Sequence, residues 1–134
     1  MTIEESFHFA QVEGRLPKTW ILLDNQSTVN IFSNKDLLKD VRTTHRCMRI
    51  HCNTGWSVTN MIGRLPGYPG KVWYNPDGIT NILSLADTKK YYRVKYDSHQ
   101  EKAFIIEKPD GTERHFKQTA SGLYYLDTAP PLDK

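Results

Sequence analysis

The sequence predicts an all-β or β-rich domain, and three observations support this fold class. Seven Pro and eight Gly are spread along 134 residues and divide the chain into short segments. Most of these segments are apolar or β-branched runs of strand length. Two turns, Asn53-Thr54-Gly55 and Lys108-Pro109-Asp110-Gly111-Thr112, each separate a pair of such runs, which is typical of hairpins. A chain of this length forms one ordinary domain.

The N-terminal half is expected to contain two strands joined by a polar turn. The run at 19–23 is continuously apolar, which indicates a buried strand. Residues at 24–28 bond their own backbone readily, and the run at 29–32 is rich in β-branched and aromatic residues. The expected elements are a polar lead-in at 1–18 with an edge strand at 7–9, strands at 19–23 and 29–32, and a short helix over 37–38 that residues 33–36 cap.

The remaining elements are expected to be strands and hairpins with one more short helix. The run from Tyr92 to Tyr96 alternates between polar and apolar residues, as a half-buried strand does. The expected elements are a hairpin of 47–52 and 56–62, a loop at 65–70, a strand at 71–74, a turn at 75–78, a strand at 79–85, a helix at 86–90, a strand at 92–96, a hairpin of 103–107 and 114–117, a last strand at 122–127 and an extended tail at 128–134.

Composition and charge exclude several classes of protein. The net charge of +3 and the pI near 8.8 come from scattered basic residues, without a run of five or six like charges. An ordinary solvated surface explains this better than nucleic-acid binding, which would predict an affinity that falls steeply with salt. No apolar run is long enough to cross a membrane, and the first residues do not resemble a secretory signal. Two cysteines form no disulfide framework, which suits a reducing, intracellular compartment.

Asp24 is the candidate catalytic residue. An apolar strand carries its carboxylate into a short polar turn, and a second apolar strand follows immediately. A carboxylate held in this way can activate a water molecule. An Asp after an apolar strand is more often a turn-former or helix cap than a catalyst, so the residue type alone favours a structural role.

Other chemistry-bearing residues support weaker hypotheses. On a strand, His45, Cys47 and His51 share one face and Cys52 lies on the other; this spacing fits no standard zinc pattern. We therefore predict no metal and no cofactor. Trp56, Trp73 and Tyr74 could stack on nucleic-acid bases, but aromatic side chains on strands more often belong to the core. Four further acids are interpreted as solvated surface or turn residues: Asp36, Asp40, Asp87 and Asp97.

The order of these features resembles the protease segment in the polyprotein of Ty1/copia-like LTR retrotransposons. The resemblance covers residues 19–127: a strand ending in Asp24, a short helix, a central hairpin with a Gly at its tip, Asn81-Ile82-Leu83-Ser84-Leu85, and Gly122-Leu123-Tyr124-Tyr125-Leu126 near the end. It implies a small, closed, retropepsin-like acid-protease barrel with one or two short helices. The tail at 128–134 would lead towards a pre-integrase segment.

The resemblance also implies a homodimeric aspartic endopeptidase that processes its own polyprotein. Two carboxylates about 3 Å apart share a proton and serve as base and acid together; aspartic proteases are the standard example of this arrangement. One Asp24 would come from each copy, and a flap at the hairpin tip would close over the peptide substrate: Asn53, Thr54 and Gly55. Ile82 and Leu83 would support the Asp24 loop. Such a protein is expected in the cytoplasm, in a virus-like particle or an intracellular polyprotein, without membrane or nucleic-acid partners.

The active-site loop departs from the pattern of that family. Thr or Ser and then Gly usually follow the Asp, whereas this chain has Asn25 and Gln26. Asn25 can replace the hydroxyl through its amide, or a shifted register can recruit Ser27 or Thr28. Gln26 adds a Cβ and a long side chain where the backbone is expected to turn tightly. The sequence therefore leaves two hypotheses: an active variant protease, and a catalytically dead β-barrel that acts as a binding module.

Overall fold

The computed structural model describes residues 2–6, 16–52 and 55–129 of the chain. These residues form eleven strands and two short helical turns. In chain order they are β1 (Thr2–Ser6), β2 (Trp20–Asp24), β3 (Asn30–Phe32), the 3₁₀ turn η1 (Lys35–Leu37), β4 (Lys39–Cys52), β5 (Gly55–Arg64), β6 (Lys71–Tyr74), β7 (Asn81–Ser84), α1 (Leu85–Thr88), β8 (Arg93–Asp97), β9 (Glu101–Glu107), β10 (Glu113–Gln118) and β11 (Tyr124–Asp127).

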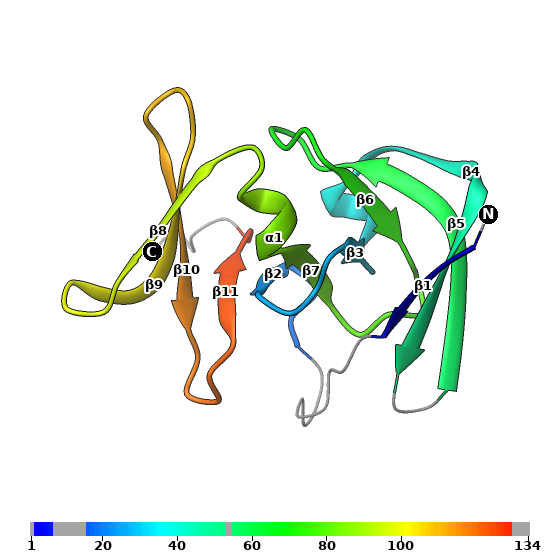
Figure 1. Cartoon of the computed structure of the whole chain (residues 1–134), viewed down its shortest axis with the longest axis horizontal. Helices are drawn as coiled ribbons and strands as arrows, with labels where there is room; N and C mark the ends of the chain where they lie inside the picture. The colour runs from blue at the N-terminus through cyan, green and yellow to red at the C-terminus, as the bar shows by residue number, and fades with distance from the viewer. Residues whose placement is uncertain (1, 7–15, 53–54, 130–134) are drawn as a thin grey trace.

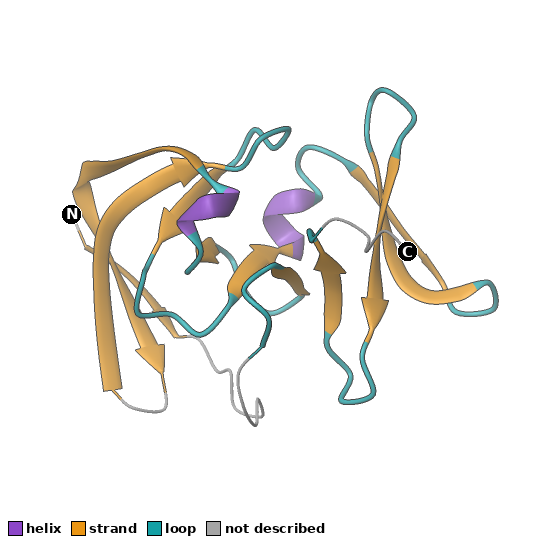
Figure 2. Ribbon diagram, turned by 180° about the vertical axis from the view of Figure 1, so that it is seen from behind, coloured by secondary structure: helices purple, strands orange, loops and turns teal. Residues whose placement is uncertain are grey.

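All eleven strands belong to one sheet, in the order β1-β4-β5-β6-β3-β7-β2-β11-β10-β9-β8. Figure 1 shows β8 to β11 at one end of the molecule and β1, β4, β5 and β6 at the other, with β2, β3, β7 and α1 between them. Figure 2 shows from behind that both helical turns lie in this central region. The β-rich fold class is therefore confirmed.

The closed barrel that the resemblance implies is not confirmed. Within the described ranges β1 and β8 are the two edges of the sheet, and they do not pair with each other. The reason lies in the C-terminal strands. From β11 the sheet continues outward through β10 and β9 to β8, away from the β4–β5 hairpin.

The centre of the sheet mixes parallel and antiparallel pairs. β2 is parallel to β7, β3 is parallel to β6, and β3 is antiparallel to β7. β7 therefore lies between β2 and β3, which are consecutive in sequence. This insertion forces the loop from β2 to β3 to pass across the end of β7.

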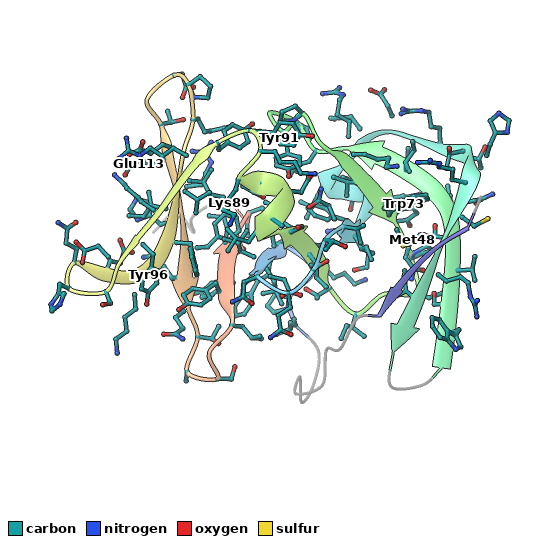
Figure 3. The ribbon with its side chains drawn as sticks, in the orientation of Figure 1. Met48, Trp73, Lys89, Tyr91, Tyr96 and Glu113 are labelled. Carbon is teal, nitrogen blue, oxygen red and sulfur yellow. The ribbon has the colours of Figure 1, made fainter. Side chains whose placement is uncertain are left out.

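Two apolar clusters lie on opposite faces of the central strands. Because successive side chains of a strand point to opposite faces, Phe32 and Val72 enter the larger cluster while Ile31 and Trp73 enter the smaller one. The larger cluster also contains Ile21, Leu23, Leu38, Tyr68, Leu83, Ile106 and Phe116. In the smaller cluster Met48 and Ile50 of β4 pack with Trp73, and Figure 3 shows Met48 and Trp73 close together between β6 and the β4–β5 hairpin.

Most predicted elements are confirmed to within a few residues, and two differences have clear causes. β4 begins at Lys39, well before the predicted 47–52, because its polar first half pairs with β5 through an irregular register. The N-terminal strand is β1, which pairs in parallel with β4 at the sheet edge. The predicted edge strand at 7–9 lies outside the described residues.

Candidate active site

Asp24 is the last residue of β2, and its position follows from the burial of that strand. Ile21, Leu22 and Leu23 are buried between β11 and β7. Asp24 lies opposite Ser84, the last residue of β7 in the same parallel register. The Asp24 side chain is only partly buried, so the strand brings a carboxylate from the core to the surface.

The loop after Asp24 is tied to the end of β7. The Ser84 hydroxyl donates a hydrogen bond to the carbonyl of Ser27 at 2.7 Å. The Ser84 N–H donates to Oδ1 of Asn30, also at 2.7 Å. Ser27 is buried, and its hydroxyl donates to the carbonyl of Val29 and accepts from the Val29 N–H. Two neutral hydrogen bonds from Ser84 therefore hold the middle of the loop and the first residue of β3.

The carboxylate of Asp24 is held by one of its two oxygens. Oδ1 accepts a hydrogen bond from the Gln26 N–H at 2.8 Å, which closes an Asx turn. Within the described part of the chain, Oδ2 of Asp24 accepts no hydrogen bond. One oxygen thus fixes the orientation of the group, and the other is open to water or to a second carboxylate.

A buried polar network lies behind this loop. Oδ2 of Asp87 accepts hydrogen bonds from Nδ2 of Asn30 at 2.8 Å and from the Tyr68 hydroxyl at 2.5 Å. Only 15% of the Asp87 side chain is exposed. Burial raises the pKa of Tyr68, and the hydrogen bond to Asp87 raises it further, so the phenol stays a donor to the carboxylate. Asn30 thus links the network to Ser84 and the loop after Asp24.

The interpretation of Asp87 as a solvated residue is wrong. Its N–H is capped by the Ser84 hydroxyl at the start of α1, and its carboxylate turns inward to Asn30 and Tyr68. Sequence reasoning also missed its two partners, Asn30 and Tyr68. The available signal was the polar Asn30 inside the apolar run at 29–32, since a buried amide requires partners.

The structure brings together part of the predicted site. Ile82 and Leu83 lie beside Leu22 and Leu23 in the β2–β7 register, next to the strand that carries Asp24. Asn25, Gln26 and Thr28 are exposed on the loop, whereas Ser27 points inward. Since Ser27 binds its own loop, its hydroxyl is engaged within the chain.

The predicted flap is only partly described. β4 and β5 form its two arms, and Cys52 pairs with Gly55 next to the tip. Gly55 has φ +122°, a conformation that favours glycine. Asn53 and Thr54 lie outside the described residues.

The backbone at Gln26 does not require glycine. Among the described residues, the non-glycine with a positive φ is Asp40, at 57°. Gln26 therefore fits the turn without backbone strain, and its side chain projects into solvent. The backbone of a single chain therefore accommodates Gln26. The remaining question is whether its side chain leaves room for a partner loop or a substrate to approach Asp24.

The described residues hold no cluster of three His, Cys, Asp or Glu side chains that suits a metal ion. No helix in the described ranges is long and apolar enough to span a bilayer.

Comparison of the chain with family models, with curated proteins and with solved structures finds no match.

Proposed function

We propose that this chain is one half of an aspartic endopeptidase that processes a polyprotein of the Ty1/copia type. The observation that carries the proposal is the position of Asp24. Its carboxylate lies at the end of a buried strand, on a loop that Ser84 anchors, with one oxygen fixed and the other open. A general base needs this combination of fixed orientation and access to water.

A second carboxylate has to come from a second copy of the chain. One carboxylate cannot both take a proton from water and give one to the leaving amide, whereas two close carboxylates that share a proton can. We propose a homodimer with a retropepsin-like fold, in which two Asp24 loops meet and the tips of the β4–β5 hairpins cover the substrate. The proposed location is the cytoplasm, in a virus-like particle or intracellular polyprotein.

The test is cleavage of a broad peptide library at mildly acidic pH by the parent, by Asp24→Asn and by Asp36→Asn. The side-chain amide introduced by Asp24→Asn can still accept the Gln26 N–H through its oxygen, so the turn is retained. Asp24→Asn should reduce cleavage by at least about 100-fold, the usual contribution of acid–base catalysis. Asp36 is exposed on η1, and its variant should cut as the parent does. Equal cutting by the parent and Asp24→Asn would assign the activity to another residue.

A non-catalytic binding module is the second candidate function, and the exposed loop side chains favour it. Asn25 and Gln26 project beside Asp24, where a partner loop and a substrate would have to approach. If Gln26 obstructs this approach, Gln26→Gly should increase cleavage, and the added Asp24→Asn change should remove it. A folded, dimeric protein that cuts nothing with either Gln or Gly at this position would leave the binding module as the function.

A further inference from the structure

A cavity of about 200 Å³ lies apart from the Asp24 loop. It is bounded by the central strands on one side and by the β9–β10 hairpin and β11 on the other. Five strands contribute apolar lining residues, which are Ile21, Leu83, Ile106, Phe116 and Leu126, and the loop between β5 and β6 adds Leu65 and Pro66. Residues 24–29 do not line it.

The mouth of the cavity carries positive charge. Lys108 and Arg114 are its only charged lining residues among those that the structure describes. The Lys108 ammonium reaches from the β9–β10 turn to the opposite wall, where a Cβ built on Gly67 would lie 3.1 Å from it. Neither side chain forms an ion pair with a described residue.

The acid on the same turn is already engaged. Asp110, on the turn between Lys108 and Arg114, does not line the cavity and accepts hydrogen bonds from the N–H and hydroxyl of Thr112. These bonds lower the pKa of Asp110, and the charges of Lys108 and Arg114 lower it further. Nη1 of Arg114 donates to the carbonyl of Glu113 at 3.2 Å, and within the described part of the chain its other donors and the Lys108 ammonium form no hydrogen bond.

The other polar groups of the cavity have partners within the chain. The Thr88 hydroxyl donates to the carbonyl of Ser84, and the Thr128 hydroxyl donates to the carbonyl of Thr19. The Tyr68 hydroxyl donates to Asp87. A ligand thus meets an apolar interior and finds its polar contacts at the mouth.

We propose that this cavity binds a small carboxylate with an apolar tail. The tail would lie against Phe116, Ile106 and Leu126, and the carboxylate would meet Lys108 and Arg114. A cavity of about 150 Å³ accommodates benzene, so this volume suits a tail of about six to eight carbons. The site is independent of Asp24, so it stands or fails separately from the proposed protease activity.

The test measures binding of octanoate, 1-octanol, octylammonium and acetate to the intact chain by calorimetry and by NMR shifts. Octanoate should bind at least about tenfold more tightly than 1-octanol, because charge-assisted hydrogen bonds add to the burial of the same tail. Octylammonium and acetate should bind more weakly than octanoate. The shifted amides should belong to the lining residues.

Charge variants separate the cavity from general surface attraction. Lys108→Met with Arg114→Met should abolish the preference for octanoate over 1-octanol and leave 1-octanol binding unchanged. The matched control is Lys102→Met with Lys117→Met, since both lysines are exposed on β9 and β10 and lie outside the cavity lining. The control should keep the preference.

Several outcomes would overturn the proposal: no octanoate binding, equal binding of octanoate and 1-octanol, or a preference that survives the loss of Lys108 and Arg114.

A further probe, N-acetyl-leucine, which resembles a peptide C-terminus, decides the source of the carboxylate. Tighter binding of N-acetyl-leucine than of octanoate would assign the site to peptide ends, and the reverse would assign it to free fatty acids.

Discussion

At the scale of single residues, the candidate site depends on polar side chains that are buried and paired. Asn30 uses both ends of its amide: Oδ1 accepts from Ser84, and Nδ2 donates to Asp87 and to the carbonyl of Lys71. Removing such a group leaves its partners without bonds inside the protein, which costs more than the bond itself contributes. Asn30 therefore holds the Asp24 loop and the Asp87 network in one arrangement.

Asn30→Leu tests this role. The variant leaves the Ser84 N–H and one bond of the Asp87 carboxylate unsatisfied, so the free energy of unfolding should fall by about 3 kcal/mol. Urea denaturation gives this value. The control is Asn60→Leu, at an exposed position of β5, which should change stability by less than about 0.5 kcal/mol. Similar effects of the two variants would contradict the role of Asn30.

Gly70→Ala tests the packing around Asp87. A Cβ on Gly70 would lie 2.5 Å from Oδ2 of Asp87 and 2.6 Å from the Tyr68 ring, so one of them has to move. The expected loss is about 2 kcal/mol of unfolding free energy, as for other overpacked sites. Gly78→Ala should cost less, because its closest contact would be 3.2 Å. Thermal or urea unfolding of both variants gives the comparison, and a larger loss at Gly78 would refute it.

At the scale of elements, β8, β9 and β10 are connected by charged side chains across the strands. Lys95 contacts Glu107 at 2.7 Å and Glu113 at 3.4 Å, and Arg93 contacts Glu107 at 3.8 Å. His115 lies between Glu101 and Glu113, at 2.9 and 3.1 Å from their carboxylates. Figure 3 shows Glu113 and Tyr96 in this end of the sheet. Exposed pairs contribute little individually, so the pH response of His115 is the more informative property.

His115 should make this part of the sheet more stable at lower pH. Its hydrogen bond to Glu101, and then that to Glu113, raise the pKa of the imidazole above its ordinary 6.5. The folded form therefore binds the proton more tightly than the unfolded form. This stabilisation is complete below pH 6.5 and is lost as pH rises through the folded pKa.

The measurement is the unfolding midpoint of the parent and of His115→Gln at about pH 6 and about pH 8. The difference between the two proteins should be larger at the lower pH. His99→Gln, on the exposed turn between β8 and β9, is the control and should shift the midpoint by the same small amount at both pH values. A His115→Gln effect that grows towards the higher pH would reverse the expected sign.

At the scale of the whole molecule, the single Asp24 of each chain makes the proposed activity a property of two copies. Mixing experiments test this directly. Equal amounts of the parent and Asp24→Asn, allowed to exchange subunits, should retain about one quarter of the activity of the same total amount of parent, because only dimers of two parent chains keep both carboxylates. A chain that acts alone would retain about one half. Sedimentation of the mixture confirms that dimers are present.

Local sequence patterns were sufficient for most strands and turns. The strand at 71–74 has the predicted bounds, because Val72 and Trp73 are apolar and Pro and Gly flank the run. The turn at 75–78 closes as its residues suggest: the Gly78 N–H donates to the Asn75 carbonyl, and Oδ1 of Asn75 accepts from Asp77. The capped helical turn also forms, with Oδ1 of Asn34 bound to the Asp36 N–H. Each of these features depends on neighbours a few residues apart.

The sequence by itself determined the β-rich class, the positions of most strands, and the place of Asp24 at the end of one strand. These features follow from interactions between residues a few positions apart. Only the tertiary structure decided that β7 inserts between β2 and β3, that Ser84 anchors the Asp24 loop, and that Asp87 is buried. These features join residues more than fifty positions apart. Strand order depends on which apolar faces pack together, and many orders satisfy the same local pattern.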